Sequence, residues 1–247
     1  VKTYFMSLSR LALVQVLHSG HPQTSGSQHM DYYITSKLKE SEVSDEYYSE
    51  KLIKMPRIPV NYSVPKIIKS NFDLASLNIS KEDFIIGLPH TLFKYHPDFD
   101  EILDKVLEEI PHGRLLFFEG LKESNTNTLI SRWKENSKNI ISRLIICSRV
   151  KFDDYLTISK RFDIVLDTFY FGMGNTFYQA MAFGIPVVTL RHDRPRGGCV
   201  SEGYKQMDIV NPPVANTAEE YISICKKLAF DNSYLKNISK QIHTKAK

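Results

Sequence analysis

From residue 83 onward, short apolar runs alternate with longer segments in which apolar residues recur at helical spacing. The apolar runs have the length of strands and are nearly continuous in Ile, Leu, Val and Phe, which is typical of strands covered on both faces. Such alternation predicts parallel strands joined by crossover helices, and therefore a doubly wound α/β layer. We expect strands at residues 83–88, 114–120, 143–148, 163–167 and 186–190, and helices at residues 98–110, 129–137, 152–162 and 175–184.

The C-terminal end of the chain continues the helical pattern without adding candidate chemistry. Residues 217–230 and 231–245 both have helical spacing. Thr217 is placed to cap the first of these helices, and either Asp231 or Asn232 is placed to cap the second.

The N-terminal end reads differently from the central layer. Residues 12–20 and 30–36 resemble strands, and residues 63–80 resemble a linker. About sixty residues with two or three strands cannot easily close a sheet alone. We therefore expect residues 1–62 to be the last part of a larger N-terminal lobe whose beginning is absent, and residues 63–247 to form a second lobe.

Composition narrows the functional classes only slightly. The chain is 42% hydrophobic and 24% charged, as in ordinary globular proteins, and its net charge of +4 favours a small anionic ligand over nucleic acid. Cys147, Cys199 and Cys225 have neither disulfide-framework nor zinc-site spacing, so a reducing compartment is expected. Since no apolar run approaches the roughly 20 residues of a membrane span, we expect a cytoplasmic protein.

A glycine-rich loop follows one of the expected strands. Asp167 ends the strand, Gly172 and Gly174 allow close approach to the backbone, and Asn175 or Thr176 starts the next helix. In an open α/β sheet, ligands bind beyond the carboxyl ends of the strands, where a helix N-terminus offers free N–H groups to phosphates. The loop therefore indicates a diphosphate site, although an ordinary strand-to-helix turn explains the glycines equally well.

Three segments favour the diphosphate site over an ordinary turn, because they resemble motifs of one family and follow one another in the same order. The loop "DTFYFGMGNTFYQAMAFGIPVVTL" (residues 167–190) resembles the nucleotide-sugar loop of the O-GlcNAc transferase and SPINDLY-like glycosyltransferases. The stretch "LALVQVLHSGHPQTSGSQHMDYYITS" (residues 11–36), with "YYSEKLIKMP" (residues 47–56) after it, resembles a second motif of that family. Residues 93–120 resemble its lysine-containing nucleotide segment. Together the segments cover most of the chain.

The resemblance implies a GT-B architecture, in which two Rossmann-like lobes face each other and the C-terminal lobe binds the donor. It also implies inverting, metal-independent transfer of GlcNAc or another hexose from a nucleotide-sugar, which we expect to be UDP-linked, to a protein or peptide side chain. No separate cofactor is implied. Two alternatives stay open: a non-catalytic module that binds a nucleotide-sugar, and a GT-B enzyme acting on a glycan or small molecule.

The resemblance also assigns roles to residues near the phosphates. Lys94 matches the lysine that meets the donor diphosphate, unless it is an ordinary surface lysine. Asn175 and Thr176 match positions that hold phosphate oxygens, next to Gly174, where relatives have histidine or glycine. Gln179 departs from the pattern, because relatives carry an acidic residue there that accepts hydrogen bonds from the ribose. An amide oxygen can still accept such bonds, but without charge assistance.

Further residues match parts of the family that lie around the base and the phosphates. The backbone at Val150 and Phe152 and the ring of Tyr155 are candidates for contacts to uracil, with plain core packing of the two rings as the alternative. Arg196, in the segment 191–198, is the candidate arginine that closes over the phosphates.

The residues around the turn at 20–26 and an Asp-x-Asp pair allow competing interpretations. His21 is a candidate general base, and the alternatives are that it lines the acceptor cleft or has a structural role. Asp98 and Asp100 have the spacing of a metal signature found in a different glycosyltransferase fold. Because they follow Pro97, we expect them to cap a helix and complement its dipole. No metal site is predicted.

Overall fold

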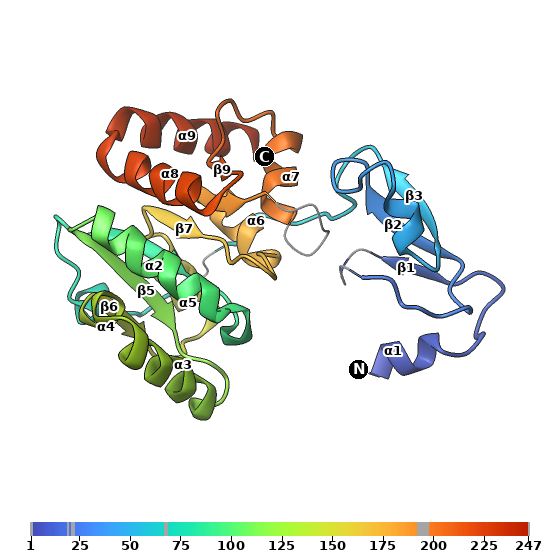
Figure 1. The fold of residues 1–247 in the computed structure, drawn as a ribbon, viewed down its shortest axis with the longest axis horizontal. Coiled ribbons are helices and arrows are strands. Elements are labelled where there is room, and N and C mark those ends of the chain that lie inside the picture. Colours follow the sequence, from blue (N-terminus) through green and yellow to red (C-terminus); the bar gives the residue numbers. More distant parts are fainter. Residues whose placement is uncertain (1, 19, 21–22, 67–68, 192–197, 247) are drawn as a thin grey trace.

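Two parallel sheets organise the part of the chain that the structure describes. The structure is a computed structural model, and it describes every residue except 1, 19, 21–22, 67–68, 192–197 and 247. The strands are β1 (Val16–His18), β2 (Tyr32–Ser36), β3 (Lys51–Met55), β4 (Phe84–Leu88), β5 (Gly113–Phe118), β6 (Leu144–Cys147), β7 (Ile164–Leu166), β8 (Val187–Leu190) and β9 (Val214–Ala215). The smaller sheet has the order β1-β2-β3, and the larger sheet has the order β6-β5-β4-β7-β8-β9 (Figure 1).

Helices join the strands of the larger sheet and cover both its faces. They are α2 (Pro97–Glu109), α3 (Glu123–Asn136), α4 (Lys138–Ser142), α5 (Phe152–Ser159), α6 (Asn175–Ala182), α7 (Cys199–Gln206), α8 (Ala218–Phe230) and α9 (Asn232–Lys245). The helix α1 (Lys2–Ser7) precedes the smaller sheet, and short 3-10 helices η1 (Ser44–Tyr47), η2 (Leu74–Leu77) and η3 (Leu92–Lys94) lie in connections. Among the described residues, no helix is long and apolar enough to cross a membrane.

The predicted doubly wound α/β layer is confirmed, with differences at element boundaries. Helix α3 begins at Glu123 rather than at residue 129, because its first turn is polar and gives no apolar period. Helix α7 was not predicted, although it buries Val200 and Tyr204 against the sheet. Thr217 caps α8 and Asp231 caps α9 as expected, since each side chain accepts a backbone N–H of the first helical turn.

The alternation of side chains along each strand explains the layers. Ile86 and Leu115 belong to one core cluster, which α2, α3, α4 and α8 cover, whereas their neighbours Ile85 and Leu116 belong to the other. Helices α5, α6, α7 and α9 contribute to this second cluster. Both faces of the sheet are therefore buried, which is why its strands are apolar at successive positions.

The connections change direction at the centre of the larger sheet. From β4 the chain runs through β5 to β6 on one side, and then returns to place β7, β8 and β9 on the other side. Strands β4 and β7 are paired neighbours and run parallel. Their carboxyl ends therefore flank a topological switch point, the place where ligands bind in open α/β sheets.

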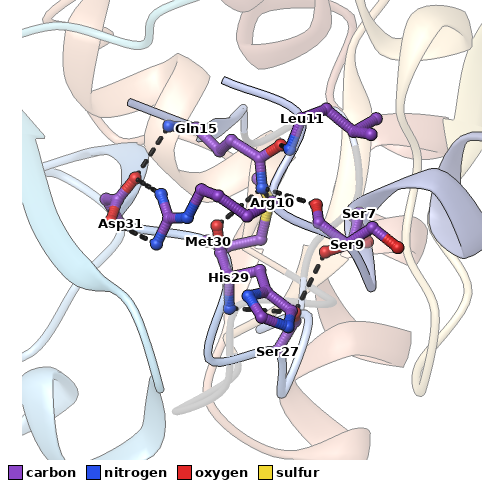
Figure 2. A network of polar contacts seen from close by, with 9 residues as sticks. All are labelled: Ser7, Ser9, Arg10, Leu11, Gln15, Ser27, His29, Met30 and Asp31. Carbon is purple, nitrogen blue, oxygen red and sulfur yellow. Dashed lines mark hydrogen bonds and ion pairs between the residues drawn. The ribbon is translucent and has the colours of Figure 1, made fainter. Parts of the chain in front are cut away.

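A polar network organises the segment that leads into the smaller sheet (Figure 2). Arg10 donates two hydrogen bonds to the carboxylate of Asp31, at 2.6 and 3.0 Å. The same carboxylate accepts the backbone N–H of Gln15 at 2.8 Å, and the Gln15 side-chain oxygen accepts the N–H of Leu11 at 2.9 Å. Since side chains satisfy these backbone groups, the strand predicted at residues 12–20 is reduced to β1.

Several apolar side chains around α1 and β1 are exposed. They are Tyr4, Phe5, Met6, Leu8, Leu11, Leu13, Val14 and Val16. An exposed group of this kind marks a contact surface in a folded protein. The division of the chain into lobes of residues 1–62 and 63–247 stays a prediction.

Limited trypsin digestion tests this division. Arg57 and Lys66 are exposed and lie outside helices and strands, between the two sheets. We expect cleavage there first, and we expect the larger fragment to keep a cooperative unfolding transition because both core clusters lie C-terminal to residue 71. Mass spectrometry of a digestion time course identifies the cut. First cleavage within residues 84–246 would contradict the proposed boundary.

Candidate functional site

Lys94 and the glycine-rich loop meet at the switch point. Lys94 lies in η3, shortly after β4, and the loop follows β7. The Nζ atom of Lys94 donates a hydrogen bond to the carbonyl oxygen of Gly172 at 2.7 Å, and it lies 4.5 Å from the centre of the Phe171 ring. The structure thus brings together two segments that are separated by 78 positions in the sequence.

The ammonium group of Lys94 lies in a partly desolvated environment. Burial lowers the pKa of Lys94, while the carboxylate of Asp167 and the thiol of Cys199 act in the opposite direction. A cation that has lost part of its water shell interacts more strongly with an incoming anion than a solvated surface lysine does. The environment of Lys94 therefore suits an anionic ligand.

Asp167 determines the shape of the loop. Its two carboxylate oxygens accept the backbone N–H of Met173 at 2.6 Å and the hydroxyl of Thr189 at 2.8 Å. The hydroxyl of Thr168 donates to the carbonyl of Phe171 at 2.9 Å. Because each end of the loop has such a bond, the backbone between residues 168 and 173 is held in one arrangement.

A buried histidine beneath the loop was not singled out from the sequence. His90 follows β4, and its Nε2 atom lies 3.7 Å from a carboxylate oxygen of Asp167. Neither ring nitrogen has a hydrogen-bond partner among the described residues. Burial lowers the pKa of His90, so the neutral ring is favoured despite the nearby carboxylate. A single histidine beside an apolar run gave no usable signal.

Helix α6 begins at the loop with its backbone open to a ligand. Gly174 is the N-cap residue and Asn175 is the first helical residue. No other heavy atom lies within 4 Å of the position that a Cβ atom on Gly174 would occupy. Asn175 is exposed and Thr176 is half-buried. The first N–H groups of a helix lack partners within the helix, so this end can bind phosphate oxygens.

A cavity of about 170 Å³ joins the loop to the smaller sheet. Lys94 and the loop form one part of its wall, and residues of α6 and α7, of β2 with its neighbouring turns, and of the segment between the sheets complete it. The lining residues are Gly20, Ser36, Lys39, Ile58, Pro59, Val60, Lys94, Phe171, Gly172, Met173, Gly174, Asn175, Tyr178, Cys199 and Glu202. Two other candidates, His21 and Arg196, lie outside the described residues.

The candidates for the nucleoside form an aromatic group beside α6. Tyr155 lies between Phe118, with ring centres 5.0 Å apart, and Phe152, with ring centres 6.2 Å apart and planes inclined by 20°. Phe152 is exposed, whereas Val150 is half-buried and packs against a core cluster. Phe152 is therefore not a core residue, since about half of it is exposed even though its ring stacks on Tyr155.

The amide of Gln179 already has two protein partners. Its oxygen accepts a hydrogen bond from the hydroxyl of Tyr155 at 3.0 Å, and its nitrogen donates to the hydroxyl of Tyr62 at 3.1 Å. The ring of Tyr62 stacks on that of Tyr178, with ring centres 5.2 Å apart. Gln179 thus links the segment between the sheets to the aromatic group, a connection that the sequence did not reveal.

The expectation that Asp98 and Asp100 cap α2 was wrong, but both lie in its first turn, where carboxylates complement the helix dipole as expected. His96 is the N-cap residue, because its backbone is extended and its ring nitrogen accepts the N–H of Asp98. Asp100 is buried, and its carboxylate accepts hydrogen bonds from Arg132 at 2.7 and 2.9 Å and from the indole of Trp133 at 2.8 Å. Within the described residues, no group of three or more potential metal ligands is found.

Asp98 contacts the glycine-rich loop instead. Its carboxylate accepts a hydrogen bond from the hydroxyl of Tyr170 at 2.6 Å. The ring of Tyr170 also packs edge-on against His96, with ring centres 4.6 Å apart. Both aspartates are therefore engaged by protein donors.

The chain is similar in sequence to known protein glycosyltransferases. Residues 5–61 match the model of glycosyl transferase family 41. The chain is 26% identical over 231 residues to a UDP-glucose:protein N-beta-glucosyltransferase of Actinobacillus pleuropneumoniae, an alignment that covers 92% of this chain and 36% of that protein. It is 24% identical over 244 residues to a probable UDP-N-acetylglucosamine–peptide N-acetylglucosaminyltransferase SPINDLY of Hordeum vulgare, covering 94% and 25% respectively. The chain thus spans between a quarter and about a third of these relatives.

Solved structures show the same arrangement of elements. An O-GlcNAc transferase mutant of Thermobaculum terrenum superposes with a TM-score of 0.80 at 24% identity, covering 94% of this chain and 44% of that one. A sucrose-phosphate synthase of Thermosynechococcus elongatus superposes with a TM-score of 0.60 at 17% identity, covering 88% and 53%. The fold is therefore of the GT-B type.

Proposed function

We propose that the chain belongs to glycosyl transferase family 41 and is part of an inverting, metal-independent protein glycosyltransferase that uses a UDP-sugar, because residues 5–61 match the model of that family and the relatives named above are protein glycosyltransferases. The observation that carries the proposal is the contact between Lys94 and the loop in front of α6, in the wall of a cavity that residues of α6 and α7 and residues near the smaller sheet complete. The transferred sugar is GlcNAc or another hexose, and the acceptor is a protein or peptide side chain. The relatives named above act on UDP-glucose and UDP-N-acetylglucosamine.

The proposed reaction is displacement at the anomeric carbon of the donor, with the nucleoside diphosphate as the leaving group. Negative charge grows on the diphosphate as its bond to the sugar breaks. The ammonium of Lys94 and the N–H groups at the start of α6, from Gly174 to Thr176, would stabilise this charge. We assign Arg196 to the same task. These groups supply fixed positive charge and dipoles, so the step requires no metal ion.

The nucleoside would lie against the aromatic group beside α6. In this assignment, the backbone at Val150 and Phe152 and the ring of Tyr155 contact the uracil. The exposure of Phe152 supports this placement. Gln179 would form hydrogen bonds with the ribose while keeping its bonds to Tyr155 and Tyr62. Its amide oxygen can accept a second hydrogen bond, and its amide nitrogen can donate a second one.

The acceptor would enter from the side of the smaller sheet. Gly20 lies in the cavity wall. The resemblance to the family is what suggests a role for His21 towards the acceptor, as lining of the acceptor cleft or as general base. Whether His21 removes the proton of the acceptor is tested by the pH profile of a His21→Ala variant.

The proposed function is tested by titrating the protein with UDP, GDP and a UDP-hexose, and by mass spectrometry of a peptide incubated with the UDP-hexose. We expect UDP to bind better than GDP and the peptide to gain one hexose. Binding of UDP without any transfer would favour a non-catalytic module. Absence of binding by every nucleotide would contradict the proposal.

Removal of divalent metal ions provides an independent prediction. UDP affinity is expected to be the same in EDTA as in millimolar magnesium or manganese, because Lys94 and backbone N–H groups provide the positive charge. Isothermal titration calorimetry in the two buffers measures this. A large loss of affinity in EDTA would show that the diphosphate is bound through a metal ion.

A further inference from the structure

A buried carboxyl group lies in the cavity wall and has no role so far. Glu202 lies in the first turn of α7, and only 5% of the residue is exposed. It lines the cavity together with Lys94 and Asn175. No side-chain hydrogen bond or ion pair joins Glu202 to another described residue. A buried carboxyl group without partners is costly, so one that persists in a cavity wall points to a ligand.

The start of α7 leaves room for this carboxyl group. Gly198 is the N-cap residue of α7. A Cβ atom on Gly198 would lie only 2.2 Å from the Oε1 atom of Glu202. The carboxyl group therefore lies over the helix N-terminus, in space that any other residue at position 198 would restrict. The positive end of the helix dipole faces it there.

The charges around Glu202 come from both parts of the chain. Burial raises the pKa of Glu202 to about 7, Lys39 and Lys205 oppose this shift, and Glu40 adds to it. Lys39 and Glu40 follow β2 of the smaller sheet, whereas Lys205 lies on α7 itself. Among the described residues, the thiol of Cys199 and the hydroxyl of Tyr178 are further titratable groups nearby, since the charge of Glu202 acts on both. Around neutral pH, Glu202 can thus be either charged or neutral.

The chemistry of a carboxylate decides which part of the donor can lie against it. Phosphate oxygens are negative and only accept hydrogen bonds, so a carboxylate repels them. The hydroxyl groups of a hexose are neutral donors, and a carboxylate accepts from them through strong, charge-assisted bonds. The cavity therefore has a cationic part at Lys94 that suits the diphosphate and an acidic part at Glu202 that suits the sugar.

We infer that Glu202, with Lys39 beside it, forms the subsite that binds hydroxyl groups of the hexose transferred by this protein. This inference rests on the proposed function, because it assigns one part of the same donor cavity. The subsite selects the sugar, whereas Lys94 and the loop hold the diphosphate whatever sugar is attached. Lys39 completes the subsite from the smaller sheet, so both parts of the chain contact the hexose.

The test compares UDP with UDP-glucose and UDP-GlcNAc in calorimetric titrations of the whole chain. E202Q keeps the shape of the side chain but removes the charge, so the variant is expected to fold as the parent does. We expect it to weaken binding of the UDP-hexose that the parent prefers by about 10-fold or more, the loss of one charge-assisted bond. UDP affinity should stay equal or rise, because a negative charge has left the cavity.

Two further measurements separate sugar binding from a structural role. The ratio of parent to E202Q affinity for the UDP-hexose should be largest at pH 8 and approach one at pH 6, because the protonated carboxyl group resembles the amide. Titration of the ligand affects both proteins alike and cancels in this ratio. Gly198→Ala, which keeps Glu202 but displaces its carboxyl group, should also lower UDP-hexose affinity more than UDP affinity.

Defined results would overturn the inference. Equal losses for UDP and UDP-hexose in E202Q would mean that Glu202 supports the fold, and unchanged UDP-hexose affinity at pH 8 would mean that the sugar does not meet it. In either case UDP still binds the parent, and the proposed function stands. If the parent bound no UDP at all, both the proposed function and this inference would fail.

Discussion

Replacing Lys94 with alanine is expected to weaken UDP binding about 10- to 150-fold and to leave uridine binding unchanged. A charge-assisted hydrogen bond is worth about 1.5–3 kcal/mol, which corresponds to this range of affinities. Uridine has no phosphate, so its binding does not include the contact that this substitution removes. The difference between the two ligands isolates the phosphate contact from any general effect on the site. Isothermal titration calorimetry with both ligands measures it.

Lys227→Ala is the matched control for this prediction. Lys227 lies on α8, away from the cavity, and its Nζ atom lies 4.3 Å from the centre of the Tyr234 ring, much as Lys94 meets Phe171. Its loss removes one positive charge and one lysine–aromatic contact without touching the loop. We expect both ligands to bind this variant as they bind the parent. Equal losses for UDP and uridine in Lys94→Ala would instead show that the lysine maintains the loop rather than holding phosphate.

Replacing Asp100 with alanine is expected to lower the free energy of unfolding by about 3 kcal/mol, near the low end of the range for breaking a buried ion pair. The loss leaves the guanidinium of Arg132 without its carboxylate, although Arg132 is partly exposed and can recover some water contacts. It also leaves the indole N–H of the fully buried Trp133 without an acceptor. Chemical denaturation measures the effect. The slope of the free energy of unfolding against denaturant concentration should stay unchanged.

Asp98→Ala is the control for this second prediction, because Asp98 lies in the same helical turn but is exposed. Its carboxylate contacts Tyr170 at the surface, and we expect its loss to cost no more than about 1 kcal/mol. The pair of variants also tests the metal interpretation of the Asp-x-Asp spacing. If both variants lost metal-dependent UDP binding without losing stability, the two aspartates would be metal ligands and our interpretation of the structure would be wrong.

The sequence anticipated local features better than the partners of individual side chains. The cap of α8 by Thr217 could be predicted because it involves a residue only three positions away. The cap of α2 was assigned to Asp98 or Asp100 on the same reasoning, and His96 holds that place. Composition of the first turn could not separate these residues, because what distinguishes Asp100 is its burial beside Arg132 and Trp133, more than thirty positions away.

Among the candidate site residues, the predictable part is the part that a motif encodes. Lys94, Gly174 and Asn175 were named from the sequence, and the structure places all three in the wall of one cavity. Glu202 and His90 were not named, because neither has a local pattern that differs from an ordinary surface or core residue. His90 lies near Asp167, which follows β7, and Glu202 lies near Lys39 and Glu40, which follow β2.

By itself, the sequence determined the alternation of strands and helices, the position of the loop after β7, and the resemblance to a family. Apolar periodicity and glycine spacing are local properties of a chain, so they can be read without a structure. Only the tertiary structure decided which groups meet. It joined Lys94 to Gly172 across 78 positions, linked Gln179 to Tyr62 across 117, and placed the carboxyl group of Glu202 in the same cavity as Lys94. The reason is physical: the order of strands about the switch point sets these distances, and burial sets the charge of each group that ends up there.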